Sequence, residues 1–503
     1  MWRYATRQAP EAPRMPEHDV IVVGAGNAAL AAAVSAREQG AGRVLVLEKA
    51  PEELRGGNTH YSGGLFRFAF DTGEDLRPLV PDAERRIPGF LSDVEPYPKK
   101  RFWEDLLRVT EGRSDPELGE ILIGRSFETV AWMAGKGIPL EPALSLSGVR
   151  VGNKIKWSPG AVIRAEHEGV GLSRSWFEIA ERAGVEIRYA TSAIRLLQDR
   201  GGRVTGVSTE SARGFEDVTA SAVVLGCGGF EANPAWRARY LGRPWDHAKV
   251  RGTRYNTGDG LRMAVEIRAL PFGQWTGCHS TPIDADAPPY GDRKLTDKTN
   301  RLSYPYGVLV NNRGRRFFDE GEDFQFYTYA KLGGIILNEP GGVGYQIFDA
   351  KVAHLLEGRY KTGTPLVADT LAALVDRLPV DRAVCRRVLD DYNGAVGAGA
   401  FDPTVRDGLA TKGLELPKSN WAQRLDTAPF VAYPVTGGIT FTFGGVRINE
   451  RAQVIGTSWA PIPGLYACGE MVGGLFHGNY PGGTGLMSGA VFGRIAGAHA
   501  AGE

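Results

Sequence analysis

The feature that most constrains the fold is a strand, a glycine turn, a helix and a second strand within residues 19–48. In such a βαβ unit Gly24 permits the tight turn, Gly26 lets the backbone approach a pyrophosphate, and the N–H groups that begin the helix bind the phosphates. Ala29 occupies the third glycine position and allows close packing of helix on strand. Glu48 stands 24 residues after Gly24, where an acidic residue accepts hydrogen bonds from ribose hydroxyls. The segment therefore predicts a site for an adenine dinucleotide.

The bulk composition excludes several classes of protein. A net charge of +1 over 503 residues gives no overall field that would favour nucleic acid. No apolar run approaches the ~18 residues that a membrane span needs. Residues 1–16 are polar and lack the apolar core of a signal peptide, so we expect a flexible arm on a cytoplasmic protein. The four cysteines form no Cys-x-x-Cys pair, and we expect neither a disulfide framework nor a metal site.

Helical and strand patterns alternate through the first half of the chain. Helices are expected within 101–136 and at 173–183, and strands at 185–189, 193–197, 203–209 and 222–226. This alternation predicts an α/β fold, a Rossmann-like domain whose parallel sheet carries a small antiparallel insert.

The amino-acid composition changes in the third quarter of the chain and becomes glycine-rich again near the end. Residues 271–432 are rich in aromatics, prolines and charges, and we interpret them as an α+β cap domain that covers a substrate. Glycine-rich text and a final helix at 486–500 follow. Residues 17–270 and 433–503 are therefore expected to form one discontinuous cofactor domain. A C-terminal segment that completes the cofactor site is typical of a permanently held flavin rather than a nicotinamide.

Recognisable motifs lie along nearly the whole chain, in order at 20–48, 56–64, 226–230, 257–260, 314–320, 464–470 and 480–497. Together they resemble the flavoprotein family of fumarate reductase, succinate dehydrogenase and 3-ketosteroid dehydrogenase. The resemblance implies FAD extended across the sheet, a small-molecule substrate closed against it by the cap, and an electron acceptor that the sequence does not identify. A histidine that links FAD covalently would be expected near Gly57, which is not a histidine, so we expect non-covalent FAD.

The resemblance also implies a role for each matching residue of the cofactor site. Gly24, Gly26 and Glu48 would hold the adenosine half, and Asn58 and Thr59 the pyrophosphate and ribityl. Glu470 would bind the ribityl chain, and amides around Gly485 would face the ring, because amides at a helix start stabilise negative charge on a reduced flavin. The full expected set is Gly24, Gly26, Asn27, Ala28, Glu48, Lys49, Gly57, Asn58, Thr59, Ser62, Gly63, Gly64, Gly228, Asp259, Gly469, Glu470, Gly485 and Leu486.

The substrate site departs from the fumarate reductase pattern. Fumarate reductases have an arginine where this chain has Tyr480 and a histidine in the stretch that here holds Phe441. They also have a proton-donating arginine where this chain has aromatic residues around Phe324. We therefore expect no fumarate reduction by the usual residues. A tyrosine at position 480 is similar to the ketosteroid dehydrogenases. The sequences at 319–324 and 438–443 are instead most similar to tricarballylate dehydrogenase, which oxidises a tricarboxylate to cis-aconitate.

Tyr480 and His279 are the predicted catalytic residues. His279 falls about where the family keeps a histidine that binds a substrate carboxylate or carbonyl, and the alternative is a core histidine bonded to a backbone carbonyl. Tyr480 can act as a base, stabilise an enolate oxygen, or merely pack beside a glycine turn. Arg67, Arg164 and His477 are candidate substrate ligands. The alternatives are a surface position for Arg67 and an ion pair with a nearby glutamate for Arg164.

These observations predict an FAD-dependent dehydrogenase or reductase that acts on a CH–CH bond next to a carboxylate or carbonyl, with a tricarballylate-like polycarboxylate favoured. One alternative substrate is a cyclic ketone, as in ketosteroid-type 1,2-dehydrogenation. An alternative of another class is an electron-relay subunit without a substrate of its own. Two or more arginines converging on the flavin would favour a polyacid, whereas one tyrosine in an apolar aromatic pocket would favour a ketone.

Overall fold

The computed structural model of the chain describes residues 16–151 and 154–503, so the expected N-terminal arm lies outside the described residues except for Pro16. Within the described part, no helix is both long and apolar enough to cross a membrane.

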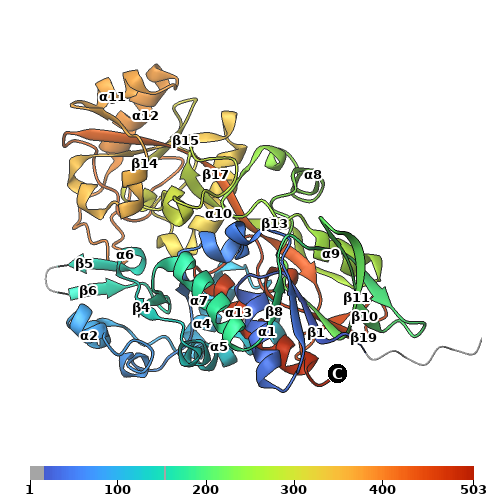
Figure 1. The fold of residues 1–503 in the computed structure, drawn as a ribbon. Helices are drawn as coiled ribbons and strands as arrows, with labels where there is room; N and C mark the ends of the chain where they lie inside the picture. Colours follow the sequence, from blue (N-terminus) through green and yellow to red (C-terminus); the bar gives the residue numbers. More distant parts are fainter. Residues whose placement is uncertain (1–15, 152–153) are drawn as a thin grey trace, which may run out of the picture.

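The first sheet is built on the predicted βαβ unit (Figure 1). Its strands run in the order β18-β19-β11-β1-β2-β8, parallel from β19 to β8, and β9 and β10 extend β11 as an antiparallel insert. β1 and β2 are almost completely buried, as expected for parallel strands covered on both faces. The expected fold class is confirmed. The elements are β1 (His18–Val23), α1 (Asn27–Glu38), β2 (Val44–Leu47), β8 (Glu186–Arg188), β9 (Ser192–Gln198), β10 (Val204–Ser211), β11 (Gly214–Leu225), β18 (Gln453–Ile455) and β19 (Pro461–Ala467).

A second, largely antiparallel sheet has β14 and β15 beside α11 and α12, at the opposite end of the molecule from β10 and β11, and its strands β13 and β17 reach the middle (Figure 1). It has its own hydrophobic cluster, which includes Val310, Ile347 and Leu389. β17 is common to the expected cap and the expected cofactor domain, so the boundary at 432 stays a prediction. The elements are β12 (Lys249–Val250), β13 (Pro271–Asp284), β14 (Val308–Asn311), α10 (Tyr329–Asn338), β15 (Val343–Phe348), β16 (Leu366–Ala368), α11 (Leu371–Arg377), α12 (Arg382–Ala395) and β17 (Phe430–Val446).

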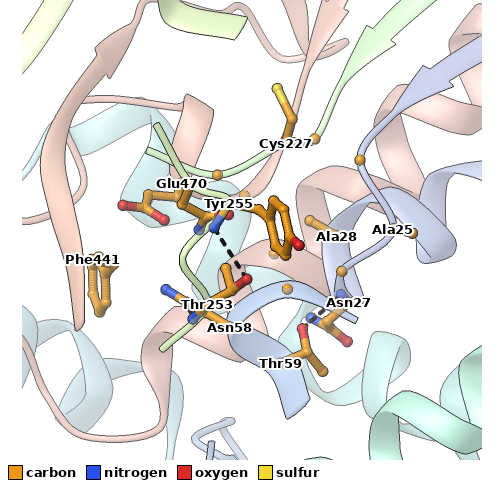
Figure 2. A pocket seen from close by; sticks show the side chains of 18 of the residues that line it. Ala25, Asn27, Ala28, Asn58, Thr59, Cys227, Thr253, Tyr255, Phe441 and Glu470 are labelled. Carbon is orange, nitrogen blue, oxygen red and sulfur yellow. Dashed lines mark hydrogen bonds between the residues drawn. The ribbon is translucent and has the colours of Figure 1, made fainter. Parts of the chain in front are cut away.

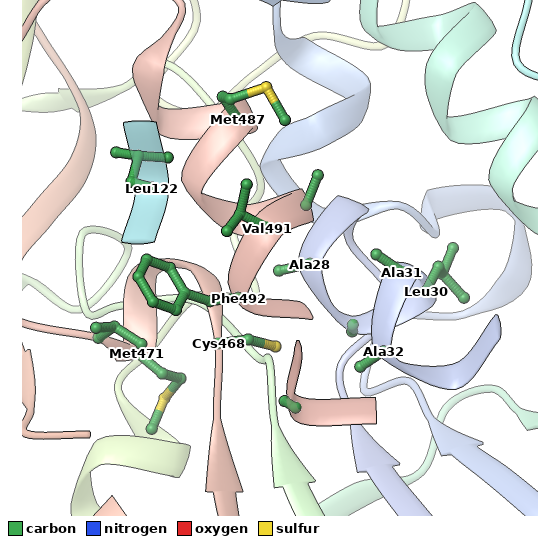
Figure 3. Packing of buried hydrophobic residues seen from close by; sticks show 14 of the residues in the cluster. Ala28, Leu30, Ala31, Ala32, Leu122, Cys468, Met471, Met487, Val491 and Phe492 are labelled. Carbon is green, nitrogen blue, oxygen red and sulfur yellow. The ribbon is translucent and has the colours of Figure 1, made fainter. Parts of the chain in front are cut away.

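The C-terminal helix α13 (Thr484–Ala500) packs directly on α1 (Figure 3). A Cβ at Gly493 would lie 2.3 Å from the carbonyl oxygen of Ala28, so only glycine allows this approach. The contact brings the beginning of α13 beside the beginning of α1, where the Asn27 side chain donates a 2.8 Å hydrogen bond to the Leu486 carbonyl. A segment near the beginning of the described chain and one near its end thereby lie side by side.

The remaining elements cover the first sheet or link it to the second. The expected helical region at 101–136 is two helices, because Asp115 accepts a hydrogen bond from Leu118 N (3.1 Å) and so begins a new helix. The elements are β3 (Leu65–Phe66), α2 (Ala83–Arg86), α3 (Phe90–Asp93), α4 (Lys99–Val109), α5 (Pro116–Lys136), β4 (Leu140–Pro142), α6 (Leu144–Ser147), β5 (Gly148–Val151), β6 (Lys154–Trp157), β7 (Ile163–Ala165), α7 (Glu168–Arg182), α8 (Pro234–Trp236) and α9 (Asp259–Glu266).

Candidate active site

A large cavity of about 1510 Å³, including its open mouth, lies where the loops after β1, β2 and β11 meet the beginning of α13. Figure 2 shows Phe441 and Glu470 on the far side of this cavity from Ala25 and Ala28. Gly63 and Gly64 follow Ser62 but lie outside the lining. The expected cofactor residues on the lining are Gly24, Gly26, Asn27, Ala28, Glu48, Lys49, Gly57, Asn58, Thr59, Ser62, Gly228, Asp259, Gly469, Glu470, Gly485 and Leu486.

The glycine turn owes its shape to close backbone packing. Gly24 has a φ of +100°, and a Cβ there would lie 2.7 Å from the Gly226 carbonyl oxygen. A Cβ at Gly226 would in turn lie 3.0 Å from Cβ of Ala29, which explains why that helix position holds a small residue. Close packing between β1, β11 and α1 therefore fixes the glycine turn, which lies on the cavity lining.

Glu48 lies at the end of β2 and is nearly inaccessible. Its Oε1 accepts a 2.7 Å hydrogen bond from Ala50 N. Burial raises the pKa of the Glu48 carboxyl to about 7, against the opposing effect of that hydrogen bond and of the Lys49 charge. A ligand hydroxyl that donates to this carboxyl would favour its ionised form.

Polar side chains in the middle of the cavity are held by mutual hydrogen bonds. Asn58 donates to Oε1 of Glu231 (2.7 Å) and accepts from Thr253 N (2.8 Å). Glu470 accepts from Thr442 N at 2.6 Å. Burial raises the pKa of Glu470 and, more strongly, that of the neighbouring Glu231. These groups offer fixed donors and acceptors to a polar ligand chain.

The far end of the cavity is aromatic, and of the two predicted catalytic residues Tyr480 is on the lining and His279 is not. Tyr480 lies on the lining and shares a short hydroxyl–hydroxyl hydrogen bond with Tyr329. The His279 ring packs behind them, with its centroid 4.9 Å from each of the two tyrosine rings and 5.2 Å from that of Phe441. Sequence reasoning missed Tyr329, which lies in no recognisable motif.

Burial also decides the charge of these side chains. His279 is 1% exposed, and neither ring nitrogen has a hydrogen-bond partner among the described residues, although the backbone of Ala330 lies nearby. Burial and the charge of Arg251 lower the pKa of His279 well below its usual value. Burial raises the pKa of Tyr480, although the Tyr329 hydrogen bond and the charge of Arg251 act in the opposite direction. At neutral pH the histidine is neutral, and Tyr480 keeps its proton.

A buried charge cluster adjoins the aromatic end, and sequence reasoning missed it. Arg251 lines the cavity, and its Nη1 is 2.5 Å from Oδ1 of Asp297, which also pairs with Arg359. Arg251 lies six residues before the Thr257 motif, so its proximity to that motif was the available signal. Asp297 and Arg359 lie in the sequence of the expected cap domain, and neither is close to a recognised motif.

The three expected substrate ligands lie outside the cavity lining. Arg67 is fully buried, and its Nε donates a 2.8 Å hydrogen bond to the Gly482 carbonyl, in the turn that follows Tyr480. Arg164 forms ion pairs, including one of 3.0 Å with Glu168, as its alternative interpretation supposed. His477 is half-buried beside that turn. Their direct contact with a substrate stays a prediction.

Comparison with known proteins decides the family. Residues 19–86 and 90–486 match the model of a family described as an FAD binding domain. The chain belongs to this FAD-binding family. It is 28% identical over 488 residues to the fumarate reductase (cytochrome) of Shewanella frigidimarina, which covers 96% of this chain and 77% of the relative. It is 27% identical over 567 residues to the 3-oxosteroid 1-dehydrogenase of Mycolicibacterium smegmatis, covering 95% and 96%.

The fold comparison agrees with this assignment. The open conformation of a flavocytochrome c3 fumarate reductase superposes with a TM-score of 0.73 at 26% identity, covering 97% of this chain and 79% of that one. The expected family and the expected cofactor, FAD, are confirmed. This FAD protein is an enzyme, an oxidoreductase of the class that acts on CH–CH bonds.

The residues of the cavity fit FAD. A helix start supplies N–H groups without partners inside the helix, and two such residues, Gly485 and Leu486, lie on the lining. Glu48 and the Gly24 turn suit the adenosine and pyrophosphate, and Asn58 and Glu470 suit the ribityl chain. When bound, FAD supplies the group that accepts or donates hydride. No cluster of three or more potential metal ligands occurs in the described residues.

Proposed function

We propose that this enzyme adds or removes hydrogen across a carbon–carbon bond next to a carboxylate or carbonyl, with a polycarboxylate similar to tricarballylate as the favoured substrate. The observation that carries the proposal is the aromatic end of the FAD cavity, where Tyr480, Tyr329 and the unpartnered His279 meet. Relatives named fumarate reductase, urocanate reductase and 3-oxosteroid 1-dehydrogenase support this reaction type.

Each chain residue has a distinct task in this proposal. Tyr480 keeps its proton, because burial raises its pKa, and it donates a hydrogen bond to the oxygen that becomes enolate-like as the adjacent carbon loses its proton. Tyr329 can donate to the Tyr480 oxygen through the hydroxyl–hydroxyl hydrogen bond, which leaves the Tyr480 proton for the substrate. His279 is neutral and neither ring nitrogen has a partner among the described residues, so a ring nitrogen can take the proton that the carbon loses. The surrounding aromatic rings exclude water.

A cyclic ketone remains the second candidate substrate. The rings of Phe441 and Phe476 pack on Tyr480, with centroids 5.2 and 5.3 Å away, and such a wall suits an apolar substrate. Against it, Arg251 adds a permanent charge to the lining. An electron-relay subunit without a substrate would not need the unpartnered His279 beside the cavity, so we place that alternative last.

Anaerobic mixing of the holoenzyme with single compounds tests the proposal. Tricarballylate, succinate, other saturated carboxylates and cyclic ketones are each added, and bleaching of the oxidised flavin is followed. We expect a polycarboxylate to bleach the flavin and succinate to bleach it at no useful rate. For the reductive direction, the dithionite-reduced enzyme is mixed with unsaturated carboxylates, fumarate included, and reoxidation of the flavin is followed. If no compound changes the flavin in either direction, the proposal fails.

The electron acceptor and the cytoplasmic location also stay proposals. Cell fractionation checks the location, and reoxidation of the reduced enzyme by candidate acceptors checks the partner. The absence of a membrane-crossing helix among the described residues decides neither.

A further inference from the structure

Arg251 is held on the cavity wall by contacts that fix most of its guanidinium. Its Nε donates to Oγ1 of Thr440 (3.0 Å), and its Nη1 donates to Oδ1 of Asp297 (2.5 Å) and to the Tyr61 carbonyl (3.3 Å). Nη2 makes no hydrogen bond to any residue in the described part of the chain. Because a guanidinium has five N–H donors in a rigid fork, one edge of Arg251 is left to donate to something else.

Arg251 lies on the wall of the cavity that also holds Tyr480 and Thr440. Its charge influences the pKa values of His279, Tyr329 and Tyr480. A ligand that contacts Tyr480 from the cavity therefore lies within the field of Arg251.

Arg251 shares its carboxylate partner with a second arginine. Asp297 is 3% exposed and pairs with both Arg251 and Arg359. Glu357 pairs with Arg359 at 3.3 Å and forms no ion pair with Arg251 in the described part of the chain. The free Nη2 of Arg251 can therefore donate to an anion in the cavity.

We propose that Arg251, positioned by Asp297, binds a carboxylate of the substrate through its Nη2, the guanidinium nitrogen left without a partner among the described residues. The inference rests on the proposed function and selects its substrate class, a carboxylic acid rather than a neutral ketone. The carboxylate accepts hydrogen bonds from a permanent cation, while Tyr480 and His279 act at the carbon–carbon bond beside it.

Carboxylate binding to the oxidised holoenzyme tests the inference without turnover. Malonate, which has no CH–CH bond to oxidise, is titrated while the oxidised flavin absorbance is followed. We expect wild type to show a saturable perturbation, Arg251→Gln to raise the malonate Kd at least tenfold, and Arg251→Lys to raise it less. Arg254→Gln is the matched control: it lies three residues on, exposed and outside the lining, and should leave the Kd unchanged.

The flavin-to-protein ratio and the melting temperature show whether each variant is folded. Should Arg251→Gln lose FAD, Arg251→Lys decides, because lysine keeps the charge but cannot present a fork. Equal malonate Kd values for wild type and the informative variant overturn the inference, as does a wild type that does not bind malonate.

The two proposals can fail separately. Bleaching by a cyclic ketone without any carboxylate binding overturns the inference and leaves the reaction type intact. Arg251-dependent malonate binding in an enzyme that no compound reduces or reoxidises supports the inference and removes the proposed reaction.

Discussion

At the scale of single residues, burial sets the protonation of the side chains at the aromatic end of the cavity. The pKa of Tyr329 is raised well above its usual value, that of Tyr480 is raised, and that of His279 is lowered. In each case burial is the largest cause, because a charged form loses its hydration there. These side chains therefore act as neutral hydrogen-bonding groups, and Arg251 supplies positive charge beside them.

Replacing Tyr480 with Phe should keep the fold and the FAD but slow flavin reduction by the true substrate at least ~10²-fold, the lower end for one acid–base or oxyanion group. Anaerobic stopped-flow absorbance and the flavin-to-protein ratio measure the two effects. Tyr360→Phe is the control, since it removes a buried hydroxyl that bonds Gln346, away from the cavity lining. Full activity of Tyr480→Phe would leave His279 as the leading candidate.

Glu48 should make FAD binding depend on pH. Its pKa of about 7 in the folded chain exceeds the ordinary 4.5, so the protonated carboxyl stabilises the apoprotein below pH 4.5, and this contribution is lost as the pH rises through 7. Ribose hydroxyls that donate to Glu48 favour the ionised form. FAD affinity of the apoprotein, measured by fluorescence quenching, should therefore rise roughly tenfold from pH 6 to pH 8.

The control for this prediction is Glu48→Gln, which cannot ionise and should lack the pH dependence. Glu48→Lys should retain FAD poorly at every pH, because it places a cation where an acceptor is needed. If wild type and Glu48→Gln respond alike to pH, Glu48 does not bind the ribose.

At the scale of elements, the cofactor site depends on how closely α13 approaches α1. Gly493→Ala would place a methyl group 2.3 Å from the Ala28 carbonyl oxygen, and the helices must separate. We expect a loss of about 1–3 kcal/mol in the free energy of unfolding, together with weaker FAD retention. Thermal melting and flavin content measure both.

The matched control is Gly124→Ala in α5. Gly124 is exposed, and its Cβ would meet nothing within 4 Å, so alanine should stabilise the helix by about 0.5–1 kcal/mol. A stable Gly493→Ala that is rich in FAD would show that the two helices tolerate separation.

At the scale of the whole molecule, segments from both ends of the chain enclose one cavity, so FAD should stabilise the protein as a ligand. Position 57, where a histidine that links FAD covalently would be expected, holds glycine. The nearby His60 is buried, its Nε2 has no hydrogen-bond partner among the described residues, and burial lowers the pKa of its imidazole to about 4. We expect the yellow protein to release intact FAD on acid or heat denaturation. FAD added back should raise the melting temperature of the apoprotein. Flavin that stays in the precipitate would show a covalent bond.

The sequence by itself determined the nucleotide half of this protein. The turn at Gly24 and the acid at Glu48 belong to one βαβ unit, whose geometry follows from local backbone preferences and a fixed spacing. The same holds for the centre of the parallel sheet, since β1, β2 and the end of β11 are local apolar runs. Local patterns therefore predicted the fold class, and the family resemblance added a part of the lining.

Only the tertiary structure decided what stands at the substrate end. Arg251, Asp297 and Arg359 are separated by tens of residues. They meet because Arg251 follows β12, which pairs with β17, and because the helical turns at Thr296–Thr299 and Gly358–Thr362 pack against each other. Packing also buries Arg67 against the Gly482 carbonyl, in the turn that follows Tyr480, and leaves it outside the cavity lining. Side-chain charge and reactivity depend on neighbours brought together by packing, and no local spacing encodes those neighbours.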